Sequence, residues 1–167
     1  MKNEGAKART KIVTVLKFED GTKKVWEGHN LITNEGDLVM AEKLADDTPT
    51  YAFVNCVLGT GATAAAKTDT YDSVTPISGS NKAPSAGYPK VNDTDTDNTG
   101  KGTDVCTWKY AWATGDFNNA AVREGCITIA SPIAGSKIFN RWVEAAAYEK
   151  SSSATLIQYV NVTITGA

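Results

Sequence analysis

The sequence contains little histidine and cysteine, and both shortages narrow the functions open to it. His29 is the only histidine among 167 residues, so a histidine metal site or a Ser-His-Asp triad would depend on this one residue. The cysteines, Cys56, Cys106 and Cys126, are odd in number and form no C-x-x-C pair, which argues against a disulfide framework and a zinc site. We interpret them as buried small residues. The composition favours a protein that is not an enzyme and needs no cofactor.

Long apolar runs and a dominant charge are also missing. No segment approaches the ~18 consecutive apolar residues of a membrane span, and the first residues lack the apolar core of a signal peptide. Lys and Arg number 17 against 19 Asp and Glu, and no stripe of basic residues alternates with aromatic ones. We expect a protein made in a reducing cytoplasm, without a membrane or nucleic-acid partner.

The residues that are abundant predict a mainly β protein. Valine and isoleucine together number 22, threonine 21 and leucine only 6, and β-branched side chains suit a pleated, half-buried surface. Residues 11–18 and 22–27 read as a hairpin joined through Asp20-Gly21, a dipeptide suited to a type I′ turn. Further strands are expected at 51–58, from 103 to 112, and near 120–130, 137–147 and 154–165.

One helix is predicted, over about 35–46. Asn34 provides an N-cap with an acidic residue three positions later, and Leu38, Ala41 and Ala45 follow at helical spacing. Residues 62–102 contain few large apolar side chains, so they predict a long irregular loop that forms no core of its own. Such a loop either lies exposed to solvent or gains order on a neighbouring subunit.

Together these patterns predict one antiparallel β-sandwich, jelly-roll-like, over residues 11–167. It would carry one short helix, the long loop at 62–102 and an extended basic arm at 1–10. In the last strand, alternation sends Leu156, Val160 and Val162 to one face and Tyr159 and Asn161 to the other.

Three stretches resemble small structural proteins of tailed bacteriophages, which include capsid decoration proteins and tail-fibre or baseplate modules. Residues 30–36 (NLITNEG) are similar to their N-x-I-T-N-x-G start of a short helix. Residues 58–64 (LGTGATA) followed by Thr68-Asp69-Thr70 resemble their G-T-G-T-T-A-P … D-T-x-L loop, with alanine in place of the usual proline. Residues 123–127 (REGCI) resemble their I-x-E-x-G-L/I strand.

The resemblance implies a non-enzymatic virion protein, commonly a homotrimer, with an assembly or host-contact role. The length of the chain favours a capsid decoration or cement protein that binds the major capsid protein. A tail-fibre, baseplate or adaptor module, or a carbohydrate- or cell-surface-binding module for a host surface glycan, is the alternative. Under the first reading, Lys2, Lys7, Arg9 and Lys11 would bind acidic patches on the shell.

Two other patterns have both a functional and a structural interpretation. Asp93, Asp95, Asp97 and Asp104 mimic the spacing of a calcium loop, although Asn98 replaces the invariant glycine; the alternative is a solvated acidic loop. Trp108, Tyr110 and Trp112 share one face of a strand and, with Trp142, form either a core or interface stripe or a sugar-stacking platform.

A hydrolytic pair is the last alternative. Glu124 and Glu144 lie on neighbouring predicted strands, and two carboxylates that meet across strands could serve glycoside hydrolysis. A rim or interface role is the simpler interpretation.

Overall fold

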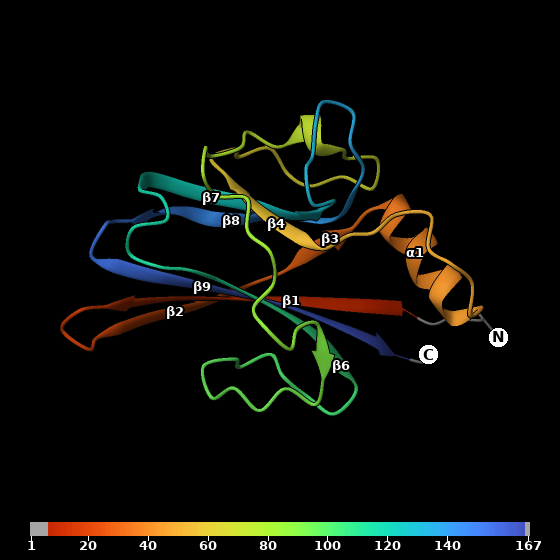
Figure 1. The fold of residues 1–167 in the computed structure, drawn as a ribbon, viewed down its shortest axis with the longest axis horizontal. Coiled ribbons are helices and arrows are strands. Elements are labelled where there is room, and N and C mark those ends of the chain that lie inside the picture. The colour runs from red at the N-terminus through yellow and green to blue at the C-terminus, as the bar shows by residue number, and fades with distance from the viewer. Residues whose placement is uncertain (1–6, 166–167) are drawn as a thin grey trace.

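Alternating apolar residues place one face of each long strand in a shared core, and the result is a sandwich of two antiparallel sheets (Figure 1). The structure is a computed structural model and describes residues 7–165. The first sheet has the strand order β2-β1-β9-β6-β5 and the second β3-β8-β7-β4. The prediction of a mainly β sandwich with one short helix is therefore confirmed.

The elements follow the predicted segments with shifted ends. The first sheet consists of β1 (Lys7–Phe18), β2 (Lys23–Gly28), β5 (Lys90–Val91), β6 (Val105–Trp112) and β9 (Ala154–Thr165). The second consists of β3 (Asn30–Ile32), β4 (Asn55–Gly59), β7 (Asn119–Thr128) and β8 (Ile138–Lys150). The helices are α1 (Asn34–Leu44) and a short 3-10 turn, η1 (Tyr71–Ser73).

The N-terminal strand is longer than predicted. Lys7 to Thr10 pair in register with the end of β9, so these residues belong to the sheet and not to a separate arm at 1–10. The hairpin between β1 and β2 also differs from the two-residue turn that was expected. Its connection spans residues 19–22, with Gly21 at φ +82° and its N–H donating to the carbonyl of Phe18.

Helix α1 sits on the sandwich mainly through its first turn. Thr33, not Asn34, is the N-cap, and its side chain accepts from the Gly36 N–H. Gly36 lies so close to the carbonyl of Phe139 that a Cβ would overlap it. Beyond this turn, apolar side chains of the helix are exposed, with Leu38 at 42% and Leu44 at 77%. Within residues 7–165, no helix combines the length and apolar character needed to cross a bilayer.

The polar loop at 62–102 is part of the domain and wraps around it as a strap, a name we use for residues 60–102. Its first half covers the outer face of the second sheet, where Val74 packs on Val57, Cys126 and Ile138. The strap then crosses the side formed by β4 and β6, and Lys82 exchanges backbone hydrogen bonds with Cys56. Figure 1 shows this path from the upper to the lower layer.

The second half of the strap covers the outer face of the first sheet. Asn98 bonds with Asn161 of β9, and Asp97 forms ion pairs with Lys17 and Lys23 of the β1-β2 hairpin. Polar contacts with the chain's own sheets, and not a hydrophobic core of its own, hold this segment in place. The alternatives of a loop that extends into solvent or needs a neighbour for order are not what the structure shows.

Candidate functional site

Glu124 and Arg141 form a buried ion-pair cluster between β7, β8 and the strap. Glu124 is 1% exposed and its Oε2 accepts from Arg141 Nε at 3.0 Å and Nη2 at 2.7 Å. Its Oε1 accepts from the backbone N–H groups of Gly61 and Thr75, each at 2.7 Å. Arg141 also bonds to Asp69 at 2.9 Å. Four donors therefore fix the position of this one carboxylate.

This cluster explains the Gly-Thr-Gly sequence that the resemblance had singled out. A Cβ on Gly59 or Gly61 would overlap the Glu124 carboxylate. Both glycines therefore let the strap approach β7 closely enough for its N–H groups to donate. The motif serves the attachment of the strap to the sheet.

Glu124 and Glu144 do not form a hydrolytic pair. Glu124 points to the outer face, toward the strap, and bonds to Arg141. Glu144 points into the sandwich, where its Oε1 accepts from Thr14 Oγ1 at 3.2 Å. Because the two carboxyl groups lie on opposite faces of one sheet, they cannot act on a shared substrate.

The acidic segment at 93–97 is neutralised by lysines. Asp95 bonds to Lys109 at 2.6 Å and to the Tyr159 hydroxyl at 2.7 Å, and Asp97 contacts two lysines. Burial raises the pKa of Asp95, but the hydrogen bonds from Lys109 and Tyr159 outweigh it and lower this pKa to about 2.

These aspartates do not converge as the calcium interpretation requires. Asp93 accepts from Tyr88 and Asn98, whereas Asp104 lies apart and lines a surface groove. Among residues 7–165, no three Asp, Glu, His or Cys side chains are grouped to hold a metal ion. The alternation of the aspartates instead distributes them among lysines of different strands.

The aromatic stripe lies on the inner face of β6, as the alternation predicted. Tyr110, Trp112 and Trp142 are buried between the sheets, with the Trp112 Nε1–H donating to the Ser80 carbonyl at 2.8 Å. A sugar-stacking platform made of all four aromatic residues is therefore not available at the surface. Trp108 alone is half-buried, packing on Phe139 with a ring-centroid distance of 5.5 Å.

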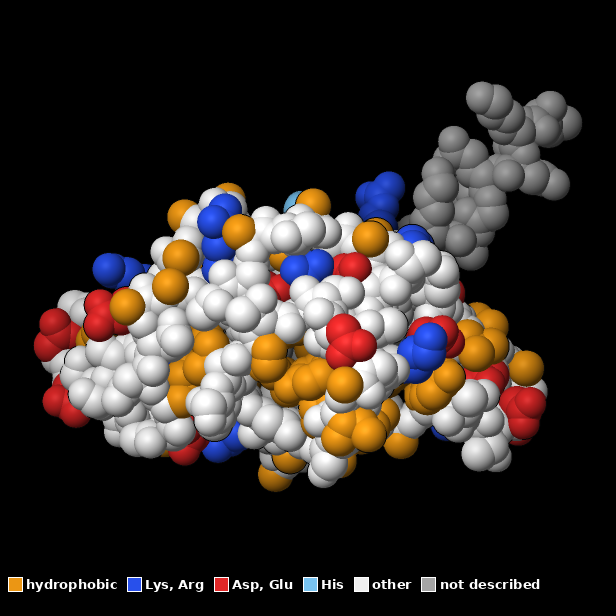
Figure 2. Space-filling model, turned by 90° about the horizontal axis from the view of Figure 1, so that it is seen from above, with side chains coloured by type: hydrophobic (Ala, Val, Ile, Leu, Met, Phe, Trp, Pro, Cys, Tyr) orange, Lys and Arg blue, Asp and Glu red, His pale blue; other side chains and the backbone are white. Residues whose placement is uncertain are grey.

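Trp108 contributes to a large concavity, a mainly apolar groove of about 810 Å³ beside α1. We define the α1 groove by its three walls: Met40 and Leu44 of the helix, the segment 48–54, and the inner residues of β6 and β9. Cys106, Trp108, Phe139 and Val162 form the inner end of the groove. Hydrophobic side chains gather at this end of the molecule, over α1, in Figure 2. The lining is mostly apolar, with Lys43, Thr48 and Asp104 among its polar residues, so the groove is a candidate interaction surface.

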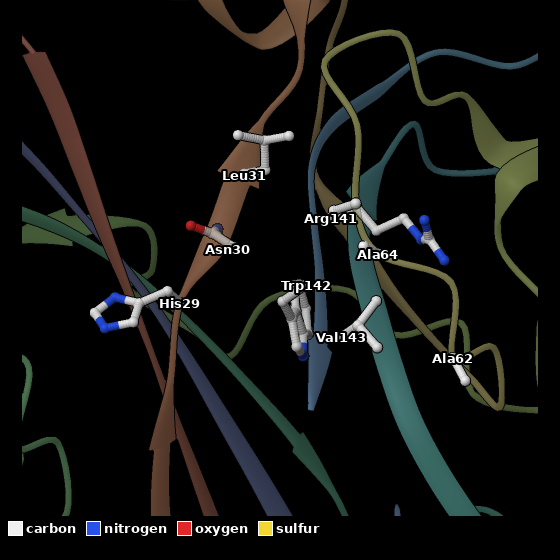
Figure 3. Close-up of a pocket in the computed structure, with 9 residues that line it drawn as sticks. His29, Asn30, Leu31, Ala62, Ala64, Arg141, Trp142 and Val143 are labelled. Atoms are coloured by element: carbon white, nitrogen blue, oxygen red, sulfur yellow. The ribbon is translucent and has the colours of Figure 1, made fainter. Parts of the chain in front are cut away.

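A smaller hollow of about 370 Å³ lies between β3, β8 and the strap, and it contains the only histidine (Figure 3). The His29 ring points away from the hollow, and its Nδ1 lies 3.1 Å from the carbonyl of Thr10. The Arg141 guanidinium also points away, toward the strap. The rest of the lining is mainly apolar, and Asn30 is its one other polar side chain.

The four basic residues expected to contact a shell differ in how the structure describes them. Lys2 lies outside the described residues, and Lys7 is described only as the first residue of β1. Arg9 is exposed on β1. Lys11 forms an ion pair with Glu27 at 2.8 Å. Of the cysteines, Cys56 and Cys126 are buried and Cys106 is half-buried, and all three are free thiols.

Sequence reasoning missed Arg141 and the two surface concavities. A buried arginine has no local signal, because its partners Glu124 and Asp69 are 17 and 72 positions away. The apolar residues of α1 have the same helical spacing whether they are buried or exposed, so nothing in the sequence indicated the groove beside them. Comparison of the chain with protein-family models, curated proteins and solved structures gave no match.

Proposed function

We propose that this protein is a non-enzymatic structural component of a tailed-phage virion, and that it acts as a capsid decoration protein. The proposal rests on the three motif resemblances between residues 30 and 127. The observation that carries its assembly role is the α1 groove. There a buried core opens to the surface beside a helix whose apolar side chains are exposed.

Burial of the α1 groove supplies a driving force for assembly. Leu44 and Val91 both line the groove, and their side chains are 77% and 58% exposed. A partner that covers them therefore removes apolar surface from water. Burying one such side chain contributes ~1.5–3 kcal/mol. In the proposal, the partner that covers this groove is another copy of the chain in a homotrimer. The major capsid protein binds the assembled trimer.

The rigid strap suits a protein that must keep its shape on a particle. Both of its halves are bonded to the chain's own sheets, through Glu124 on one face and Asp97 on the other. A surface that is already ordered loses little conformational entropy when it binds.

Sedimentation of the purified protein across a concentration series tests the oligomer, and the proposal predicts a trimer. A Leu44→Asp variant places a charge in the α1 groove and should sediment as a monomer with an unchanged circular dichroism spectrum. Leu38→Asp, at an exposed helix position outside the groove lining, is the matched control. A monomeric parent protein would contradict the homotrimer.

A further inference from the structure

A third concavity, of about 600 Å³, opens on the side of the sandwich that the strap leaves free. It lies between the edge strand β2 and the outer half of β8, and we call it the β2-β8 cleft. Trp26 and Tyr148 form an aromatic wall, with ring centroids 5.0 Å apart in an edge-to-face arrangement. The exposed run of Ala145 to Ala147 forms the opposite rim.

Glu144 lies at the base of this cleft and is only 6% exposed. Its Oε2 lies beneath Gly28, 3.2 Å from where a Cβ of that residue would stand. Among the described residues, no donor bonds to this oxygen and no lysine or arginine forms an ion pair with the carboxyl group. A buried carboxylate normally has a cation as its partner, and Glu144 has none among the described residues.

The charged groups around the cleft are engaged elsewhere. Arg123 donates to the backbone carbonyls of Glu144 and Ala145, at 3.2 and 3.3 Å. Glu27 is exposed and pairs with Lys11, and the Nδ1 of His29 lies beside the Thr10 carbonyl. The remaining titratable neighbour is the Tyr148 phenol, whose pKa is raised well above its usual value by burial.

The hydrogen-bond geometry on the far side of Glu144 favours a carboxyl group that carries a proton. The Thr14 hydroxyl has one hydrogen but lies 3.2 Å from Glu144 Oε1 and 3.1 Å from Gln158 Oε1. The Gln158 amide nitrogen is 3.4 Å from the Val13 carbonyl, which fixes the orientation of that amide. Thr14 can donate fully to only one of these two oxygens, and both contacts become hydrogen bonds when Glu144 carries a proton. Burial also raises the pKa of Glu144.

We propose that the β2-β8 cleft binds a primary alkylammonium group, which forms an ion pair with Glu144 and displaces its proton. The ammonium keeps its own three hydrogens, and the carboxyl proton passes to solvent, so charge and protons balance. Trp26 and Tyr148 contact the alkyl chain and add a cation–π attraction. The inference is independent of the virion proposal.

The group could come from a free amine or from a lysine side chain of another protein. 1,5-Diaminopentane represents the first source and Nα-acetyl-lysine N-methylamide the second. If the lysine probe binds at least as tightly as the diamine, the cleft is assigned to a protein partner. If the diamine binds more tightly, the cleft is assigned to a free amine. Either order supports the ammonium site.

The test is a chemical-shift titration of the full chain with both probes and with n-butanol as an uncharged analogue. We expect shifts at the Trp26 indole with both amines, at least tenfold weaker response to butanol, and affinity that rises between pH 5 and pH 8. Glu144→Gln keeps a donor for Thr14 and should reduce affinity at least tenfold. Glu149→Gln, at an exposed position on β8 outside the cleft lining, should leave it unchanged.

Three results would overturn the proposal. They are no response to either amine, equal response to butanol, and a Glu144→Gln variant that binds as the parent protein does. Unfolding curves of both variants establish whether a lost response reflects the site or the fold. If Glu144→Gln does not fold, the comparison of both amines with n-butanol on the parent protein decides, because a site that forms no ion pair would bind the charged and uncharged probes alike.

Discussion

Removing the negative charge of Glu124 should loosen the strap and destabilise the whole domain. The substitution Glu124→Gln keeps the shape of the side chain. Its amide can accept the Gly61 and Thr75 N–H groups through oxygen, but its NH₂ group then faces the Arg141 guanidinium, which is itself a donor. Arg141, 1% exposed, would keep only Asp69 as a charged partner.

The magnitude follows from the bonds that are lost. Two hydrogen bonds from Arg141 to Glu124, at 3.0 and 2.7 Å, are charge-assisted and desolvated. Removing one partner of a buried ion pair costs about 3–5 kcal/mol. With a urea dependence of about 2 kcal/mol per molar, the unfolding midpoint should fall by about 2 M.

Equilibrium unfolding in urea measures this loss, and amide hydrogen exchange locates it. The Gly61 and Thr75 amides should lose protection first, because their acceptor is weakened. Glu149→Gln, at an exposed position on β8, is the matched control and should change stability by less than about 0.5 kcal/mol. A Glu124→Gln variant within about 1 kcal/mol of the parent protein would refute the anchoring role.

Three further predictions concern other parts of the molecule. Lys150→Met should lower the free energy of unfolding by about 2–4 kcal/mol in urea, because the buried amine donates to three backbone carbonyls. Since the folded pKa of Asp95 is lowered to about 2, its contribution of about 2 kcal/mol is present above pH 3.8 and lost toward pH 2. Unfolding at pH 5 and pH 2.5 should show this loss, and Lys109→Met should reduce it. Leu44→Ser should change monomer stability by less than about 0.5 kcal/mol, because Leu44 is 77% exposed, yet shift sedimentation toward smaller species.

The strands could be predicted from the sequence because their signal is local. Alternation alone assigned Trp112 to the inner face of β6, and Val160 and Tyr159 to opposite faces of β9, as the structure shows. A one-residue shift would exchange these faces, so a strand with a buried side specifies its own orientation.

The strap and its anchors could not be predicted, because their contacts join distant residues. Asp97 bonds to Lys17 and Lys23, which lie 80 and 74 positions earlier in the chain, so composition alone left the loop without a site. Polar contacts with the sheets replaced the hydrophobic core that the segment lacks.

The helix shows the limit of periodicity. Spacing predicted the helix itself, but it did not show that Leu38 and Leu44 are exposed or that the helix is seated through its first turn, where Gly36 packs closely on Phe139. Periodicity identifies an apolar face, whereas only tertiary packing decides whether that face is covered.

Mass spectrometry of purified phage particles tests the central proposal most directly, by measuring the copy number of this chain relative to the major capsid protein. A capsid decoration protein should be present at a simple fraction of the shell's copies. A handful of copies per particle would assign the chain to the tail or its fibres. Its absence from the particles would contradict the virion proposal.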